Sequence, residues 1–90
     1  MDELEITPVL QALGDPVRLA IVRRLAGGEP VACGTFHLGV SPSTLTHHLK
    51  VLRQAGVVDT RVDGKRRLNM LRREELDRRF PGLLDAVIEA

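Results

Sequence analysis

Aromatic rings, cysteines and long apolar runs are scarce in this 90-residue chain. It has two Phe and no Tyr or Trp, which argues against nucleic-acid binding by base stacking and predicts an aliphatic core. One cysteine, Cys33, excludes an internal disulfide and a zinc site built only from thiolates of one chain. No apolar run approaches the roughly 20 residues of a membrane span, and no basic-then-apolar leader begins the chain, so we expect a cytoplasmic protein.

Carboxylates are absent from one long stretch. No Asp or Glu occurs from Val31 to Val58, although the chain has 12 of them. Residues 1–16 hold four acids and no basic residue, and residues 74–90 hold five acids against two arginines. Residues 17–73 hold eleven basic residues against three acidic ones, within a net charge of +1. A basic centre between acidic ends is expected when the centre meets phosphate and the ends meet something else.

The acid-free stretch predicts one well-bounded helix over residues 42–55. Ser41 can cap its free N–H groups, Pro42 suits the first helical position, and Gly56 supplies a left-handed residue to end it. One stripe of this helix is apolar, namely Leu45, Leu49 and Leu52. The opposite side is polar and consists of Ser43, Thr46, His47, Lys50 and Gln54. Such a face can approach phosphates and base edges without repulsion, so we interpret it as a DNA-reading helix; the alternative is an ordinary solvated helix.

Three shorter helical segments are expected before this helix. Thr7 and Pro8 predict the cap and first turn of a helix over residues 7–14. Asp15-Pro16 opens a core helix that ends at Gly27-Gly28. Residues 31–38 predict a brief helix, which would give helix-turn-helix order with the reading helix.

Residues 57–71 predict a β-hairpin that turns near Asp63-Gly64. A two-residue loop on Asp63-Gly64 would mix apolar and charged residues on each face, so we expect an odd-length loop with a left-handed Gly64. This register places four residues on one face: Val58, Thr60, Leu68 and Met70. It leaves Arg61 and Arg67 outward and Lys65 and Arg66 at the tip, and we expect all four to contact DNA. The tip could reach the DNA backbone or the adjacent minor groove; the alternative is a basic hairpin that only solubilises a sheet edge.

The C-terminal residues predict a helix over residues 73–79, a break at Phe80-Pro81-Gly82 and a second apolar helical segment. We expect this segment to pair with the first helix and with its copy in a second subunit; the alternative is that it closes the core of one chain. The expected dimer interface comprises Val9, Leu10, Leu13, Leu83, Leu84, Val87 and Ile88.

Four motifs together resemble the ArsR family of bacterial winged-helix repressors, over roughly residues 9–73. They are Ala-Leu-Gly-Asp-Pro-Val-Arg-Leu at residues 12–19, Thr-His-His-Leu-Lys-Val-Leu at residues 46–52, Gly56-Val57-Val58 and the Asp63-Gly64 hairpin. The resemblance implies a homodimer joined by its terminal helices, which binds an inverted repeat and is released by an inducer. By position it implies groove contacts from Ser43, Thr44, Thr46, His47 and Lys50 and wing contacts from Lys65, Arg66 and Arg67. His48 lies toward the packing side of its helix, so we interpret it as structural.

The chain departs from the metal-sensing members of that family. Their Glu-Leu-Cys-Val-Cys-Asp motif reads Glu-Pro-Val-Ala-Cys-Gly at residues 29–34, so the first thiolate is missing. A second family site uses Asp and His on the last helix, but residues 49–90 contain no His. We therefore expect no metal site, no cofactor and an inducer other than a metal, if one acts on this chain. The alternative is a thiol- or metal-responsive repressor that uses Cys33 with His37.

These observations predict one domain over residues 1–90, mainly α with a small β-hairpin, in a winged helix-turn-helix arrangement. Residues 7–14 and 73–90 would form dimerisation helices, residues 15–56 the helical core and residues 57–71 the wing. The function expected is sequence-specific binding of double-stranded DNA by a dimeric repressor. A winged-helix module for protein contacts is the alternative, and an enzyme is disfavoured because no catalytic spacing or phosphate loop is present.

Overall fold

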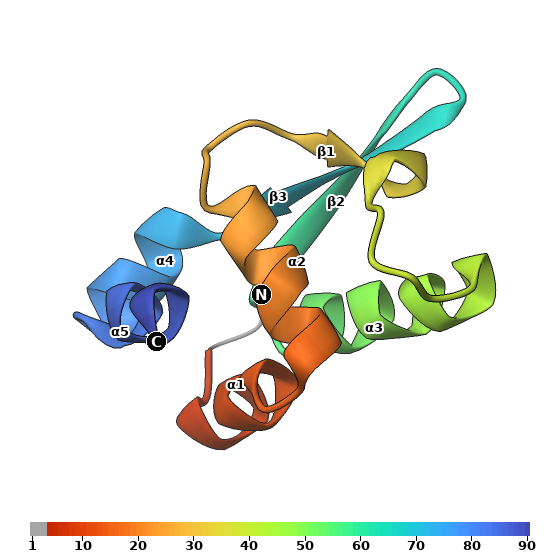
Figure 1. Cartoon of the computed structure of the whole chain (residues 1–90). Coiled ribbons are helices and arrows are strands. Elements are labelled where there is room, and N and C mark those ends of the chain that lie inside the picture. The colour runs from red at the N-terminus through yellow and green to blue at the C-terminus, as the bar shows by residue number, and fades with distance from the viewer. Residues whose placement is uncertain (1–3) are drawn as a thin grey trace.

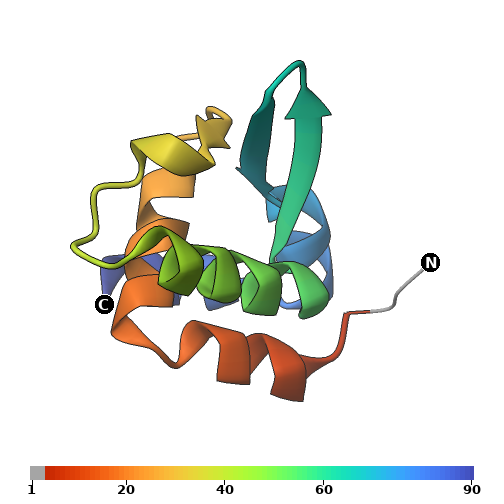
Figure 2. The same ribbon diagram turned by 90° about the vertical axis from the view of Figure 1, so that its right-hand side faces the viewer.

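The computed structural model describes residues 4–90, which form five α-helices, one 3-10 helix and a three-stranded antiparallel sheet (Figure 1). The elements in chain order are α1 (Ile6–Leu13), α2 (Pro16–Leu25), β1 (Val31–Ala32), η1 (Cys33–Thr35), α3 (Pro42–Gln54), β2 (Val58–Asp63), β3 (Arg66–Leu71), α4 (Arg73–Arg79) and α5 (Leu83–Glu89). The tip of the β2–β3 hairpin projects away from the helices, and α3 lies on the opposite side of α2 from α4 and α5 (Figures 1 and 2). The expected fold class is confirmed.

The core is aliphatic, as the composition predicts. Its largest fully buried apolar side chains come mainly from the helices, with two from the start of the hairpin: Val9, Ile21, Val22, Leu25, Leu52, Val57, Val58, Leu76 and Leu84. Phe36 is the only aromatic ring classed as buried among residues 4–90. A core of branched and unbranched aliphatic chains needs close interdigitation to reach protein packing density, because no large ring fills space.

Helices α2 and α3 begin at the predicted caps. The Asp15 carboxylate accepts hydrogen bonds from the backbone N–H of Val17 at 2.9 Å and of Arg18 at 3.1 Å. The Ser41 hydroxyl accepts one from the backbone N–H of Thr44 at 3.2 Å. Each cap satisfies N–H groups that have no partner inside the helix.

The start of α1 differs from the prediction. The helix begins at Ile6, with Glu5 at the cap position and no side-chain capping bond, so Thr7 is not the cap. The backbone N–H of Val9 already donates to the Glu5 carbonyl at 3.3 Å. Pro8 is tolerated because it falls in the first turn, where its missing N–H would have had no helical partner.

The prediction of a brief helix over residues 31–38 is also wrong. Val31 and Ala32 form an edge strand opposite Asn69 and Leu68 of β3, and only Cys33–Thr35 turn into a 3-10 helix. Pairing with a strand almost forty residues away overrides the weak local helical preference, which the sequence signal could not show. The element that precedes α3 is therefore a single 3-10 turn.

The hairpin is present, but its register is one residue away from the prediction. Its loop has two residues, Gly64 and Lys65, and Gly64 alone has a positive φ, at +62°, which matches a type II′ turn. Thr60 consequently faces Asn69, and Arg61 faces Leu68. This register places the Thr60 hydroxyl beside the buried Asn69, whose Oδ1 accepts a hydrogen bond from it at 2.9 Å.

The C-terminal prediction is confirmed in outline. Helix α4 ends before Phe80, and α5 follows a left-handed Gly82, whose φ is +86°. Arg23 of α2 donates to the carbonyls of Ile88 at 3.2 Å and Ala90 at 2.8 Å, which holds the end of α5 against α2. No helix within residues 4–90 is long and apolar enough to span a membrane.

Candidate nucleic-acid interface

Helix α3 presents a polar, carboxylate-free face to solvent. Leu45, Leu49 and Leu52 are buried beneath it. All six residues expected to contact DNA from this helix are exposed: Ser43, Thr44, Thr46, His47, Lys50 and Gln54. Small hydroxyls, an imidazole, an amide and an ammonium can donate to phosphates or base edges, and most can also accept.

His48 has the structural role that its position on the helix suggested. Its Nδ1 lies 3.1 Å from Nη1 of Arg18, an arrangement in which the guanidinium donates and the ring nitrogen accepts. The same Arg18 donates through Nε to the Ala12 carbonyl at 2.6 Å. Asp15 lies 3.8 Å from the ring, and its pKa is lowered, first by the hydrogen bond from the Arg18 backbone N–H and also by the nearby Arg18 guanidinium. This cluster fixes α3 against α1 and α2.

The basic residues of the hairpin divide between its two faces. Arg67 shares a face with Thr60 and Asn69, on the side of the cleft lined by α3, whereas Arg61 lies on the opposite face with Leu68. The expectation that Arg61 and Arg67 point outward together is therefore wrong, because the register is shifted. Arg61 and the tip residues Lys65, Arg66 and Arg67 are all exposed.

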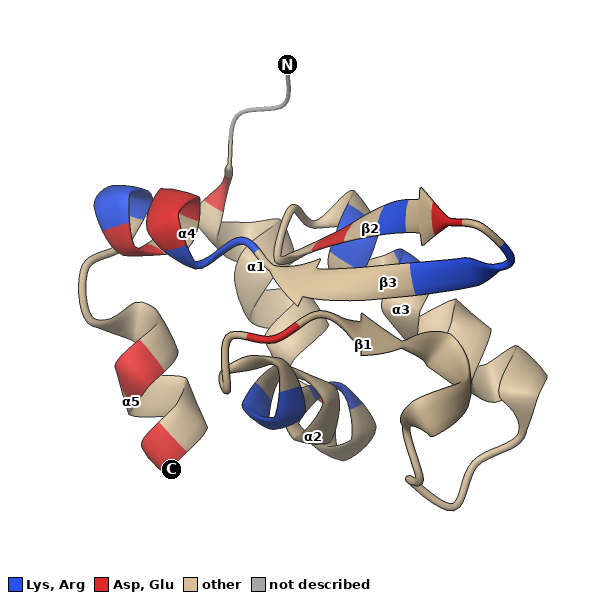
Figure 3. Ribbon diagram, turned by 90° about the horizontal axis from the view of Figure 1, so that it is seen from above, with Lys and Arg blue, Asp and Glu red and all other residues tan. Residues whose placement is uncertain are grey.

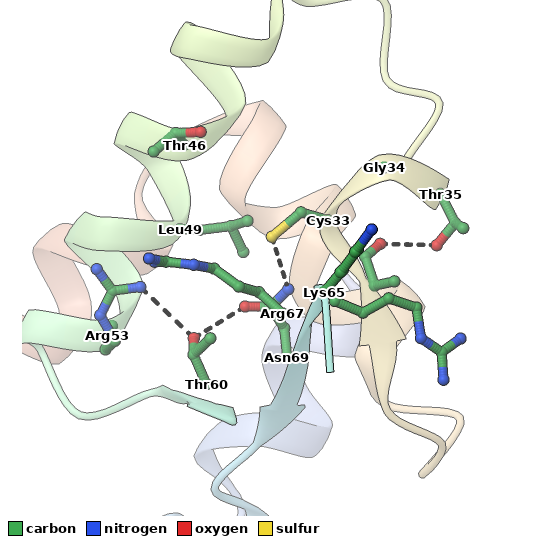
Figure 4. A pocket seen from close by; sticks show the side chains of 12 residues that line it. Cys33, Gly34, Thr35, Thr46, Leu49, Arg53, Thr60, Lys65, Arg67 and Asn69 are labelled. Carbon is green, nitrogen blue, oxygen red and sulfur yellow. Dashed lines mark hydrogen bonds between the residues drawn. The ribbon is translucent and has the colours of Figure 1, made fainter. Parts of the chain in front are cut away.

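A cleft of about 730 Å³ separates α3 from the hairpin (Figure 4). Its walls come from α3, the hairpin and η1, and no Asp or Glu is among the lining residues. The lining residues are Ala32, Cys33, Gly34, Thr35, Thr46, Leu49, Arg53, Thr60, Lys65, Arg66, Arg67 and Asn69. Four of them are cationic, so the cleft concentrates positive potential between two exposed elements.

A chain of hydrogen bonds crosses the floor of this cleft. Arg53 lies 3.5 Å from the Thr60 hydroxyl, which donates to Oδ1 of Asn69 at 2.9 Å. Nδ2 of Asn69 donates to the Val31 carbonyl at 3.1 Å and contacts Sγ of Cys33 at 3.3 Å. A fully buried amide with every polar atom satisfied links the hairpin to β1 and η1 in one geometry.

Sequence reasoning missed Arg53 and Asn69 as members of this site. Arg53 follows Thr46 by seven residues, which is two helical turns, so both lie on the same flank of α3 and this spacing could have found it. Asn69 stands between two apolar residues of the second hairpin strand, and a polar residue there was the available signal.

Cys33 and His37 do not share a helical face. Cys33 begins η1 and is partly buried, whereas His37 lies beyond that element and is exposed. Within residues 4–90, no group of three or more His, Cys, Asp or Glu side chains is arranged to hold a metal ion. The absence of metal control remains a prediction.

The residues expected at a dimer interface have different degrees of burial within one chain. Val9, Leu13 and Leu84 lie in the core, where each is at most 4% exposed. Leu83, Val87 and Ile88 are partly buried. Leu10 is 49% exposed, and Ile6, one turn before it on α1, is 43% exposed. An apolar pair on the surface of α1 thus remains available to a partner.

Comparisons with known proteins agree with this architecture. A helix-turn-helix domain family matches residues 13–61. The chain is similar to an arsenical resistance operon repressor of Staphylococcus xylosus, with 38% identity over 78 residues that cover 86% of this chain and 75% of the relative. It is 33% identical over 82 residues to an uncharacterised helix-turn-helix transcriptional regulator of Bacillus subtilis, covering 88% of this chain and 82% of the relative.

Solved structures give the same result. The crystal structure of the transcriptional repressor BigR from Xylella fastidiosa superposes with a TM-score of 0.73 at 28% identity, covering 93% of this chain and 83% of that one. A further ArsR family regulator shares the fold with a TM-score of 0.72 at 23% identity, covering 81% of each chain. The capped α3, the hairpin beside it and these similarities agree: the chain belongs to the ArsR family of winged helix-turn-helix transcriptional regulators.

Proposed function

We propose that the protein is a homodimeric repressor that binds double-stranded DNA at an inverted repeat, with α3 in the major groove and the hairpin tip reaching the flanking backbone or minor groove. The exposed face of α3, which has polar and cationic side chains and no carboxylate, carries the proposal. The relatives whose names describe repressors support the direction of regulation. This role would place the protein in the cytoplasm, with the DNA.

The groove contacts proposed from α3 are Ser43, Thr44, Thr46, His47, Lys50 and Gln54. The wing contacts are Lys65, Arg66 and Arg67. A two-fold dimer would place its two reading helices in successive major grooves, so the half-sites should lie about one helical turn, roughly 10 base pairs, apart. An inducer would be a small molecule rather than a metal, because the first thiolate of the family's motif and the histidine of its last-helix site are both missing from this sequence.

The salt dependence of DNA binding tests this function. The affinity for the preferred duplex should fall steeply with salt, by about 0.9 log units per log unit of salt for each phosphate neutralised. Lys50→Ala and Arg66→Ala should each weaken binding, with a reduction of the salt slope of up to about one where the side chain contacts a phosphate. Arg78→Ala, which removes the same charge from exposed α4, is the control and should leave the slope unchanged. An affinity indifferent to salt and to Lys50 and Arg66 would favour a protein-contact module instead.

The dimer is tested separately. Ile6 and Leu10 form one exposed apolar face on α1, and the partly buried residues of α5 could extend it. Sedimentation analysis should find a dimer for the native chain and a monomer for Leu10→Glu. Val62→Glu is the control, since Val62 is 69% exposed on the hairpin and far from α1 in sequence. A native chain that remains monomeric at micromolar concentration would contradict the dimer.

A further inference from the structure

The cleft between α3 and the hairpin has a defined position relative to a bound duplex. The sugar-phosphate backbone is what separates a major groove from the adjacent minor groove. An element in the major groove and another in the next minor groove must therefore lie on either side of one strand of that backbone. Figure 2 shows α3 and the hairpin as separate arms that diverge from the short segment joining them. Residues of both arms line the cleft. The inference that follows rests on the proposed function.

The chemistry of the cleft suits a phosphate. Arg53 projects into it from α3, and Arg67 extends from β3 across it toward Arg53 (Figure 4). Lys65 lines it as well. None of these three cations forms an ion pair within residues 4–90, whereas their neighbour Arg66 pairs with Asp63 at 3.5 Å. Guanidinium groups present several N–H donors in a planar fork, which matches the oxygens of a phosphate.

The floor of the cleft leaves these donors free. Arg53 uses one N–H for the Thr60 hydroxyl, at the outer limit of a hydrogen bond, and keeps its other donors. Thr60 is itself fixed by the buried Asn69. The guanidinium of Arg53 is thus oriented by uncharged groups, and no neighbouring carboxylate competes with an incoming anion.

We propose that this cleft is a phosphate-binding site that seats one backbone phosphate of DNA, at the strand between the groove read by α3 and the groove reached by the hairpin. Arg53 and Arg67 are its two guanidinium ligands, one from each arm, and Lys65 adds charge. By binding both arms, the phosphate would fix the position of α3 relative to the hairpin when the protein is on the duplex.

Variants of the two arginines test the site in the full-length protein. Arg53→Gln and Arg67→Gln should each weaken binding to the preferred duplex roughly tenfold, the effect of losing a charged hydrogen bond. Both guanidinium groups would bind the same phosphate, so their effects on affinity should not be independent. The loss of affinity in the double variant should therefore differ by more than about twofold from the product of the two single losses. Arg78→Gln is the matched control and should change the affinity less than twofold.

A second measurement separates DNA from free phosphate. Arginine side-chain NMR signals of the DNA-free protein are followed while sodium phosphate replaces sodium chloride at constant ionic strength and pH. Phosphate-induced shifts confined to the Arg53 and Arg67 signals would support a phosphate site that is already formed in the free protein. If no such shifts occur but the variants bind DNA more weakly, the result would support a site that forms only when the duplex binds. Phosphate shifts with unchanged DNA affinity in both variants would assign the site to a free phosphate compound and overturn the backbone assignment.

The outcomes also distinguish the inference from the proposed function. Suppose that the native protein binds duplex DNA with a steep salt slope, and that the Arg53 and Arg67 variants bind as well as the Arg78 control. This result would overturn the phosphate site in the cleft but leave the proposed DNA binding intact. A native protein that binds no duplex overturns the proposed function and with it the backbone assignment. The phosphate titration then still reports whether the cleft binds phosphate at all.

Discussion

The two ends of the molecule use charge in opposite ways. At the α4–α5 end, Arg72 pairs with Glu75 at 2.7 Å, and Arg73 pairs with Asp77 at 3.1 Å and also with Asp85. At the α3–hairpin end, where lysines and arginines are more frequent than acids (Figure 3), most cations have no carboxylate partner among residues 4–90. The first end uses the charges of Arg72 and Arg73 in contacts within the chain, whereas the second leaves most of its cations without a carboxylate partner among the described residues.

The largest expected effect is a loss of stability at Gly56, which lies at the junction between α3 and the hairpin. Gly56 has a φ of +85°, and a Cβ there would clash with a methyl carbon of Leu4. Gly56→Ala should therefore lower the free energy of unfolding by about 3 kcal/mol, through backbone strain and overpacking. Urea denaturation measures this effect.

Gly64→Ala is the control for that substitution. Gly64 also has a positive φ, at +62°, but a Cβ there would meet no atom within 4 Å beyond its chain neighbours, so the variant isolates the backbone cost. Gly64→Ala should cost less than Gly56→Ala. Equal losses would show that the contact with Leu4 contributes nothing.

A smaller effect compares the caps of helices α3 and α1. Ser41→Ala removes the side-chain cap of α3 and should cost about 1 kcal/mol in unfolding free energy. Glu5→Ala is its counterpart on α1 and should be nearly neutral, because Glu5 makes no side-chain capping bond. Thermal unfolding of both variants is the measurement. A loss at Glu5 as large as that at Ser41 would contradict the capping assignment.

The ion pairs of the acidic end should contribute still less. Arg73→Gln breaks the contacts with Asp77 and Asp85, which are partly exposed, and should cost about 0.5 kcal/mol. Its affinity for DNA should not change, whereas Lys50→Gln should weaken DNA binding without a comparable loss of stability. Fluorescence anisotropy measures the DNA affinity of both variants. Weaker DNA binding by Arg73→Gln would contradict the assignment of DNA binding to the α3–hairpin end alone.

The pH dependence of stability should show the contribution of Asp15. Its folded-state pKa is lowered by the backbone N–H of Arg18 and by the Arg18 guanidinium, so it favours the folded state when ionised. This contribution should be complete above the pKa of the unfolded chain, near 3.8, and should be lost as the pH falls through the lower folded value. Comparing urea unfolding of the native chain and Asp15→Asn from pH 6 to pH 2.5 tests it. The difference between the two should shrink at the acid end, and a constant difference would exclude the titration of Asp15 as its source.

Local signals predicted the elements that are bounded by caps and turns. Asp15, Ser41 and Gly82 mark their helix boundaries through backbone requirements that act over a few residues, and all three boundaries are observed. The polar face of α3 follows in the same way from helical spacing.

Features that depend on distant partners were missed. The strand at Val31 exists because β3 lies beside it, and the observed hairpin register brings Thr60 to the buried Asn69, which the loop sequence alone did not reveal. A one-residue change of register reverses every side chain of a strand, so Arg67, which was expected outward, lies on the cleft face of β3 for the same reason. The cleft itself also required the relative placement of α3 and the hairpin, which spacing along one helix could not give.

Arg18 has a consequence for how a dimer would hold DNA. This one side chain reaches the last turn of α1 through the Ala12 carbonyl and reaches α3 through His48. A second subunit docked on α1 would therefore act on a helix that is directly fastened to the reading helix. The contact between the subunits, well away from the bases, would therefore set the angle between the two α3 helices. That angle would determine which operator spacings the dimer tolerates.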